Sequence, residues 1–426
     1  MHVKIKTAKM TYEEVLALPV PFHEKPVRQR MLFRILLFVL SLWDLWRTRF
    51  TYQTMGIEKL GRKEPCLVLM NHSSFIDLKI AARLLVTRPF HVVCTADGFV
   101  GKQWLMRWIG AIPTKKFMMD VALVRDMVYT VKELQSSILM FPEASYSFDG
   151  TQTTLPENLG KCLKLLKVPV VMIRASGAFT RDPLYNNLQL RKVHVSAEVE
   201  YLLSPEEIAR MSAQELNAFL QEKFTFDYFR WQQENRIRVK EPFRADGLNR
   251  MLYKCPCCRM EGQMLGQGIW IRCQHCGMAW ELTEYGYLQS PNKEKQYFTH
   301  VPDWYQWERE CVRKELEEGA YRLEVPVTIY MMVNTDCLYQ VGDGILVHSL
   351  EGFHLTGCSG KLKYTQDPSA SYSLYSDFYW YEIGDMISIG DARAQYYCFP
   401  MAGGDIVAKT RLAAEELYKL VKERAK

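Results

Sequence analysis

The sequence lacks an apolar run long enough to cross a bilayer, and it lacks an export signal. Its most apolar segment, residues 31–46, is interrupted by Arg34 and Asp44, and its clean core is far shorter than the ~20 residues that a spanning helix needs. The first thirty residues show no charged start followed by an apolar run and a small-residue cleavage site. We therefore expect a chain that is not exported, with a helix that lies in the membrane interface.

Cations and indoles flank this apolar segment. They are Arg28, Arg30, Arg47 and Arg49 around it and Trp43 and Trp46 near one end. Cations in such places meet lipid phosphates, and indoles sit among headgroups. The alternative is a helix packed on the protein's own core. The pattern predicts a peripheral, monotopic protein on the cytoplasmic face of a membrane, with residues 1–50 as the interface segment.

Repeats and low-complexity tracts are also absent, which argues against solenoids and disordered tails. With 426 residues and 48% hydrophobic content, the chain can bury more than one core, since single cores stop growing near ~250–300 residues. The net charge of +6 is mild, so it favours anionic lipid or phosphorylated substrates without demanding nucleic acid. Twelve cysteines are diluted over a long chain and four form two close pairs, which indicates a metal site in a reducing compartment.

Short β-type runs alternate with helical segments through the first half of the chain. The predicted strands are Cys66–Met70, His91–Thr95, Ile138–Phe141, Val168–Ile173 and Val193–Val199, and the predicted helices are Asp77–Leu85, Asp120–Leu134 and Leu159–Leu166. This alternation predicts an α/β fold with a mostly parallel sheet flanked by helices. Capping boxes that start at Ser204 and Ser212 mark two further helices and close this domain, which we place at residues 51–240.

The second half changes character. Two cysteine pairs in residues 250–290 predict a small zinc ribbon, and residues 321–426 are β-rich. The strands predicted there are Val325–Asn334, Gly344–Ser349, Phe378–Ile383 and Gln395–Phe399, followed by a helix at Asp405–Lys422. Strands that end in one helix resemble a pleckstrin-homology-like module in outline.

A histidine stands where a buried strand opens into a helix. The strand that ends at Met70 runs into Asn71 and His72, with Asp77 five residues after the histidine. Neutral imidazole can take a hydroxyl proton as the oxygen attacks a thioester, and a carboxylate can orient the ring. Unpaired N–H groups at the helix start could hold the oxyanion. The alternative is that Ser74-x-x-Asp77 is only a helix cap.

Three further segments follow this one in order. The set N-H-x-x-x-x-D, a basic strand, F-P-E and V-P-V resembles the 1-acylglycerol-3-phosphate acyltransferase (glycerolipid acyltransferase) family over residues 30–235. The resemblance implies that His72 is the base, that Asp77 is its partner, and that Asn71 belongs to the substrate site. It also implies acyl-CoA or acyl-carrier protein as donor and a hydroxyl of a lysophospholipid or related lipid as acceptor.

The second motif departs from the family at its phosphate-binding arginine. Lys102, Lys115 and Lys116 occupy this stretch, and a lysine replaces the arginine, so a point charge stands in place of a planar fork. Phosphate binds a lysine less directionally. An ordinary solvated pair is the alternative for Lys115 and Lys116.

The third motif, F-P-E-A-S-Y-S, departs further. Glu143 matches, and the resemblance places it in the acceptor site, where we also expect Ser145, but Ala144 replaces a glycine and Tyr146 replaces an arginine. Without the family, Glu143 would be a surface carboxylate at a strand end. The missing cation leaves room for an acceptor head that is neutral, zwitterionic, or held by Arg174 or Arg181.

The cysteine pairs have the spacing C-x-x-C, fourteen residues, C-x-x-C. Cys255, Cys258, Cys273 and Cys276 can complete a tetrahedral zinc site, with Cys257 and His275 as the nearest competitors. Four cysteine ligands leave no position for water, so the zinc is expected to be structural. Four unmetallated thiols are the alternative.

A non-catalytic function is the main rival to an acyltransferase. The chain could be a lipid-binding protein, or a zinc-ribbon adaptor or nucleic-acid-binding protein. A nucleic-acid binder should concentrate basic charge around the ribbon, but Glu261, Glu281 and Glu284 dilute it. We therefore expect membrane lipids and an acyl donor as partners, and no nucleic acid.

Overall fold

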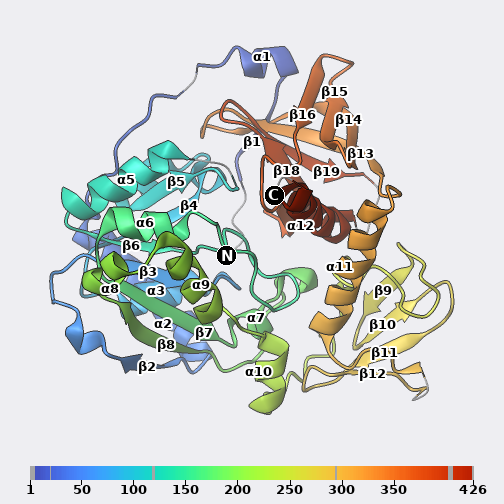
Figure 1. The fold of residues 1–426 in the computed structure, drawn as a ribbon, viewed down its shortest axis with the longest axis horizontal. Helices are drawn as coiled ribbons and strands as arrows, with labels where there is room; N and C mark the ends of the chain where they lie inside the picture. The colour runs from blue at the N-terminus through green and yellow to red at the C-terminus, as the bar shows by residue number, and fades with distance from the viewer. Residues whose placement is uncertain (1–4, 20, 118–119, 293–294, 402–405, 425–426) are drawn as a thin grey trace. The chain divides into compact units, whose positions relative to one another are not determined.

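The computed structural model describes residues 5–19, 21–117, 120–292, 295–401 and 406–424 (Figure 1). The chain forms two compact units. Unit 1 comprises residues 1–21, 183–189 and 229–426, and unit 2 comprises residues 22–182 and 190–228. The first fifty residues, predicted as one segment, are thus divided between the units after Pro21.

Unit 2 is built on a seven-stranded sheet with the order β2-β8-β7-β3-β6-β4-β5. Its strands are β2 (Thr51–Met55), β3 (Leu67–Met70), β4 (Phe90–Thr95), β5 (Ala111–Thr114), β6 (Ser137–Met140), β7 (Val170–Ser176) and β8 (Ser196–Leu203). Only the β7–β8 pair is antiparallel. The mostly parallel α/β sheet predicted from the sequence is confirmed.

Helices cover both faces of this sheet. They are α2 (Met31–Arg47), α3 (Asp77–Leu84), α4 (Gln103–Trp108), α5 (Val121–Lys132), α6 (Leu159–Leu166), α7 (Ala178–Arg181), α8 (Pro205–Arg210) and α9 (Ala213–Lys223). Both predicted capping boxes form, since Ser204 and Ser212 each accept the N–H of the glutamate three residues on and receive its carboxylate in return.

Successive residues of each strand serve opposite layers, as a pleated strand requires. Val68 and Met70 of β3 pack in one core with Leu45 of α2 and Ile80 of α3. Leu67 and Leu69 pack in the other core, whose helical members come from α5, α6 and α9. Because both faces are buried, the strands are continuous apolar runs, which is why the sequence revealed them.

Strand β2 lies at the edge of the sheet and was missed in the sequence. All five of its residues, Thr51–Met55, are exposed, so they carry neither an apolar run nor an alternating pattern. It pairs in parallel with β8, and this pairing supplies the order that its own composition does not indicate.

Unit 1 holds a four-stranded antiparallel sheet with the order β12-β11-β10-β9. Its strands are β9 (Met264–Gln267), β10 (Trp270–Cys273), β11 (Ala279–Leu282) and β12 (Leu288–Gln289). Helix α10 (Tyr228–Glu234) precedes this sheet and helix α11 (Val301–Glu317) follows it. The small sheet with its cysteine pairs agrees with the predicted ribbon.

The rest of unit 1 is an antiparallel meander followed by one helix. Its strands are β13 (Leu323–Met332), β14 (Leu338–Ser349), β15 (Gly352–Gly357), β16 (Leu362–Gln366), β17 (Tyr375–Trp380), β18 (Gly384–Gly390) and β19 (Gln395–Pro400). β19 returns to pair with β13, and the N-terminal β1 (Thr7–Lys9), followed by α1 (Tyr12–Leu16), joins β14 in parallel. The predicted β-rich region with a C-terminal helix is confirmed.

Two predicted boundaries in this region differ from the structure. The segment Phe378–Ile383, predicted as one strand, contains the end of β17 and a turn in which Tyr381 and Glu382 have positive φ. The final helix is α12 (Ile406–Arg424), whereas Asp405, its predicted start, lies outside the described residues. Within the described residues, no helix has both the length and the apolar character needed to span a membrane.

Candidate active site and candidate metal centre

Asn71 anchors the loop that follows β3. Its side-chain amide pairs with the backbone of Ala175 on β7 in both directions, through N–H···O distances of 2.8 and 2.9 Å, and it also donates to the Tyr228 hydroxyl. The same hydroxyl lies 3.1 Å from Ser73 Oγ. Asn71 therefore fixes the backbone that presents the next residue, His72, with Tyr228 as a second support that the sequence did not indicate.

His72 and Asp77 lie together as predicted. His72 Nδ1 is 3.1 Å from Asp77 Oδ2, and that oxygen also accepts the N–H groups of Ser73 at 2.7 Å and Ser74 at 3.0 Å. The Asp77 side chain is 1% exposed and the His72 side chain 19% exposed. Among the described residues, no group hydrogen-bonds His72 Nε2.

The structure contains half of the helix-cap alternative for this motif, since Asp77 Oδ2 accepts the Ser74 N–H while the Asp77 N–H donates to the Ser74 carbonyl. Helix α3 begins at Asp77 without a side-chain cap, and Ser74 Oγ donates to Asp182 while accepting the Ile76 N–H. The N–H groups of Ser73 and Ser74, which precede this helix, bind Asp77. The carboxylate uses the backbone of its own loop to hold its position beside His72.

Two aromatic rings sandwich the imidazole. The His72 ring lies 4.2 Å from the Phe141 ring and 4.0 Å from the Tyr146 ring, measured between centroids. Tyr146 stands where the family pattern has an arginine, so an aromatic wall replaces a cation. Burial lowers the pKa of His72, the Asp77 carboxylate raises it, and the charge of Lys116 lowers it. The net lowering keeps the imidazole in its neutral, basic form.

Glu143 supports the same loop from the turn that follows β6. Its carboxylate accepts the His72 N–H at 2.9 Å through one oxygen and the Thr153 N–H at 2.9 Å through the other. The side chain is fully buried, in contrast to a surface carboxylate at a strand end. The next residue, Ala144, has a φ of +55°, the conformation for which glycine is the usual choice, and Ser145 after it is buried in the same turn.

The predicted cationic residues separate into two groups. Lys116 influences the pKa of His72, and Lys102 and Lys116 both lower the pKa of the nearby Cys94 thiol, which burial raises to about 12. Lys115 and Lys116 are half-buried. Arg174 instead donates to the Lys223 carbonyl at 2.8 Å and lies 3.8 Å from Glu198. The structure thus gives Arg174 partners outside the His72 loop.

Asp182, which the sequence did not indicate, lies beside the loop together with Arg181. Asp182 accepts the Ser74 hydroxyl, and Arg181 Nη1 donates to Asp182 at 2.8 Å. Arg181, predicted as a possible headgroup ligand, also binds Asp44 of α2 at 3.1 Å. Burial raises the pKa of Asp182 to about 6, with Arg181 and Ser74 acting against it. Asp182 therefore supports the loop from a position 108 residues after Ser74 in the chain.

The four predicted cysteine ligands converge in unit 1. Their Sγ atoms all lie within 4.8 Å of one another, and two pairs, Cys255–Cys276 and Cys258–Cys273, are 3.7 Å apart. Zinc–sulfur bonds of ~2.3 Å in a tetrahedron place sulfurs roughly 3.8 Å apart. The donor set therefore fits one tetrahedral metal ion with four thiolate ligands.

The two cysteine turns have matching backbones. The Arg259 N–H donates to the Cys255 carbonyl and the Gly277 N–H donates to the Cys273 carbonyl, each at 2.9 Å. Both donors have positive φ, +64° and +74°. The sequence repeat C-x-x-C thus folds into a repeated turn that directs both thiols of a pair to the same point.

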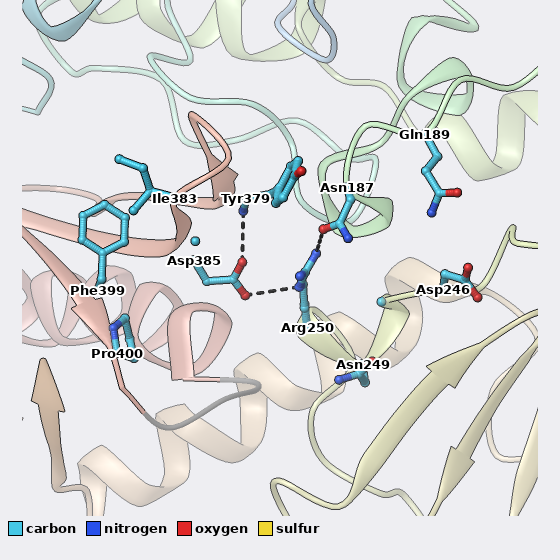
Figure 2. Close-up of a pocket in the computed structure, with 12 residues that line it drawn as sticks. Asn187, Gln189, Asp246, Asn249, Arg250, Tyr379, Ile383, Asp385, Phe399 and Pro400 are labelled. Carbon is cyan, nitrogen blue, oxygen red and sulfur yellow. Dashed lines mark hydrogen bonds and ion pairs between the residues drawn. The ribbon is translucent and has the colours of Figure 1, made fainter. Parts of the chain in front are cut away.

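Unit 1 also contains a pocket of about 550 Å³ that the sequence did not indicate. Figure 2 shows Arg250 between the side chains of Asp385, at 3.2 Å, and Asn187. Asp246 and Asn249 accept the N–H groups of Gly268 and Gly266 from the ribbon. All residues that line the pocket belong to unit 1, whereas the His72 loop belongs to unit 2. Since the Arg250 guanidinium is already paired, this pocket offers no unpaired arginine to an anion.

Comparison with known proteins bears on unit 2. Residues 52–176 match the family model described as Acyltransferase. Among solved structures, the chain is similar to the 1-acyl-sn-glycerophosphate (LPA) acyltransferase PlsC from Thermotoga maritima, with 16% identity, a TM-score of 0.37, and coverage of 45% of this chain and 76% of that chain. The matched range includes the His72 loop, Glu143 and most of the sheet. Within unit 2, residues 52–176 are therefore similar to the acyltransferase family model.

Proposed function

We propose that this protein transfers a fatty acyl group from a thioester to a lipid hydroxyl, with His72 as the general base and Asp77 as its orienting partner. One observation carries the proposal: His72 Nδ1 lies 3.1 Å from a buried carboxylate that two backbone N–H groups hold in place, while Nε2 has no partner among the described residues. This is the arrangement that a hydroxyl-activating imidazole requires.

The reaction needs no covalent enzyme intermediate. His72 Nε2 takes the proton of the acceptor hydroxyl as its oxygen attacks the thioester carbonyl carbon. The tetrahedral intermediate collapses, the C–S bond breaks, and the imidazolium returns the proton to the leaving thiolate. Asp77 stabilises the imidazolium through the whole cycle, because its carboxylate accepts the Nδ1–H. The products are an ester and a free thiol.

The acceptor in this proposal is a lysophospholipid resembling 1-acylglycerol-3-phosphate, or a related lipid, and the donor is acyl-CoA or acyl-carrier protein. Lys116 supports an anionic headgroup, since its charge acts directly on His72. The Tyr146 ring packs on His72 where the family has an arginine. It favours an acceptor headgroup with less negative charge, because it offers a flat apolar face at that point. We assign phosphate contact to Lys116, with Lys102 and Lys115 as neighbours.

We place the protein on the cytoplasmic face of a membrane, held by α2. The exposed large apolar side chains of this helix are Met31, Leu32, Ile35, Leu36, Val39, Leu40, Leu42, Trp43 and Trp46. Only Ser41 and Leu45 of α2 are buried against the domain among its described side chains. Arginines at both ends favour contact with anionic lipid. A helix that shows this much apolar surface is better matched by lipid tails than by water.

We further propose that the four-cysteine cluster binds one zinc ion with a structural role. The sulfur separations support a closed tetrahedral site, and four thiolates leave no coordination position for water. The metal would hold the two cysteine turns together and would take no part in acyl transfer.

The test is transfer of labelled acyl groups from a thioester to a panel of lysolipids in vesicles. His72→Ala should lower the rate by ~10²–10⁴-fold, the usual contribution of a general base. His194→Ala is the matched control, because that histidine is exposed and hydrogen-bonds only Thr51 among the described residues. Turnover that is equal in the wild type and in His72→Ala would refute the assignment.

A further inference from the structure

A continuous chain of polar side chains links helix α2 to the His72 loop. It starts at Asp44, the acidic residue that interrupts the apolar run of α2. Asp44 accepts from Arg181 Nη2 at 3.1 Å and from Lys79 of α3. Arg181 then donates through Nη1 to Asp182 at 2.8 Å. One guanidinium therefore bridges a carboxylate of the surface helix and a carboxylate beside the candidate active site.

Ser74 carries the link from Asp182 into the loop. Its hydroxyl donates to Asp182, and its backbone N–H donates at 3.0 Å to Asp77 Oδ2. That oxygen lies 3.1 Å from His72 Nδ1. Ser74 thus joins two carboxylates with its two donors, and any shift of Asp182 is transmitted to the oxygen that orients the imidazole.

Because the linked side chains are buried, the loss of one of them costs more than the loss of one partner of a surface ion pair. The side chains of Arg181 and Asp182 are 8% and 4% exposed, and Ser74 is 2% exposed. Exposed ion pairs tolerate loss with little effect, whereas removal of one buried partner leaves the other charge without compensation. Arg181 must therefore keep both carboxylates within reach, and the position of α2 is coupled to the position of the loop.

We propose that Asp182 is a positioning residue for the His72–Asp77 pair, and that Arg181 and Asp44 couple it to the seating of α2 on a lipid surface. This inference rests on the proposed function. Lipid contact on the exposed side of α2 holds Asp44, Asp44 holds Arg181, and Arg181 and Asp182 fix Ser74. Turnover is consequently higher with an acceptor in a vesicle than with the same acceptor dispersed as monomers.

The test measures transfer by variants of the whole chain to a lysophosphatidate acceptor presented in two ways. The acceptor is either in anionic phosphatidylglycerol vesicles or dispersed as monomers below its critical micelle concentration. Asp182→Asn should lower kcat by roughly 10²-fold, the scale of a small misplacement of reacting groups, with KM unchanged. Asp44→Asn should give a smaller loss and move the vesicle-to-monomer ratio of kcat towards one. Glu200→Gln is the control, because it breaks a 3.2 Å pair with Lys223 in the same unit away from this chain.

A pH profile separates positioning from a general structural effect. The acid limb of kcat/KM reports the imidazole, which faces Asp77 and Lys116 and has Asp182 behind Ser74. Loosening the Asp77 contact removes an influence that raises the pKa of His72, so the limb should move to lower pH in Asp182→Asn and stay in place in Glu200→Gln. Should Asp182→Asn fail to fold, Ser74→Ala removes the hydroxyl link alone and should shift the limb in the same direction.

In one outcome, the wild type transfers acyl groups, and Asp182→Asn and Ser74→Ala have the same kcat, acid limb and vesicle-to-monomer ratio as the wild type. This outcome would overturn the positioning role and leave the proposed function standing. Absence of transfer by the wild-type chain, with His72→Ala equally silent, would overturn the proposed function and this inference with it.

Discussion

The His72 region of unit 2 and the His348 region of unit 1 bury the same side chain in different ways. His348, on β14, is 1% exposed, stacks on a phenylalanine, and has the Tyr321 hydroxyl 3.0 Å from its Nδ1. His72 also stacks on aromatic rings, but its Nδ1 faces the Asp77 carboxylate and its side chain is 19% exposed. One imidazole has a neutral partner and is almost completely buried, and the other has a carboxylate partner and a partly exposed side chain.

Burial lowers the pKa of both histidines, that of His348 to about 3. A general base must also be stable after it takes a proton, and only His72 has a carboxylate that stabilises the imidazolium. A lowered pKa therefore does not identify a base by itself. The chemistry of the partner and the access to the second nitrogen distinguish a site from a core residue.

The largest expected difference between the two units is their response to loss of the metal. Cys273→Ser, or a strong chelator, should unfold residues 250–290, because a structural zinc site contributes on the order of 10 kcal/mol to folding. Unit 2 has its own two-layered core and should keep its protection from hydrogen exchange. Metal analysis of the wild type should find about one zinc per chain.

Cys162→Ser serves as the control for this experiment, since Cys162 lies on α6 in unit 2 and belongs to no cysteine cluster among the described residues. It should retain the metal. A well-folded wild-type preparation without metal would contradict the zinc assignment.

The next test separates the two histidines by pH. The folded-state pKa of His348 is about 3, below the ordinary value near 6.5, so the folded state binds fewer protons than the unfolded state between these values. Stability of unit 1 should then fall by roughly 3 kcal/mol as the pH is lowered from 6.5 to 4. Hydrogen exchange of β14 amides measures this loss.

His348→Asn removes the titrating group, so its β14 amides should show a flatter dependence on pH over the same range. An equal slope in the variant and the wild type would show that another group controls the acid sensitivity. The acid limb of acyl transfer, which reports His72, should lie below the ordinary histidine value, because burial lowers the pKa of His72.

A smaller effect should distinguish the surfaces of the two units. Replacing Trp43 and Trp46 of α2 with serine should weaken binding to anionic vesicles by about 10²-fold, since each exposed indole contributes ~1.5 kcal/mol when lipid covers it. Tyr285→Ser alters an exposed aromatic residue of unit 1 and should leave vesicle binding unchanged. Equal binding by both variants in a flotation assay would contradict the membrane role of α2.

The smallest effect should come from the turn after Glu143. Ala144 has a φ of +55°, so Ala144→Gly should raise the free energy of unfolding of unit 2 by ~1 kcal/mol by relieving left-handed strain. Ala209→Gly, in the helix α8, should lower it by about the same amount. Denaturant unfolding followed on unit 2 measures both, and equal signs would contradict the strain at Ala144.

The sequence predicted those features whose residues are close along the chain. His72 and Asp77 are five residues apart, each cysteine pair spans four, and the capping boxes at Ser204 and Ser212 are equally short. Buried parallel strands were predicted because they are apolar throughout, whereas the exposed strand β2 was missed. In the meander, strands β15, β16 and β18 were missed, because their register is set by pairing with neighbours.

By itself, the sequence indicated the candidate groups: an imidazole, a carboxylate near it, four thiols, and an apolar helix interrupted by Asp44. Only the tertiary structure decided what holds them, because Tyr228, Asp182 and Glu143 reach the loop from distant parts of the chain. A buried hydrogen bond depends on distance in space and leaves no periodic mark in the sequence. The candidate groups are therefore close along the chain, and their geometry is a product of the packed sheet.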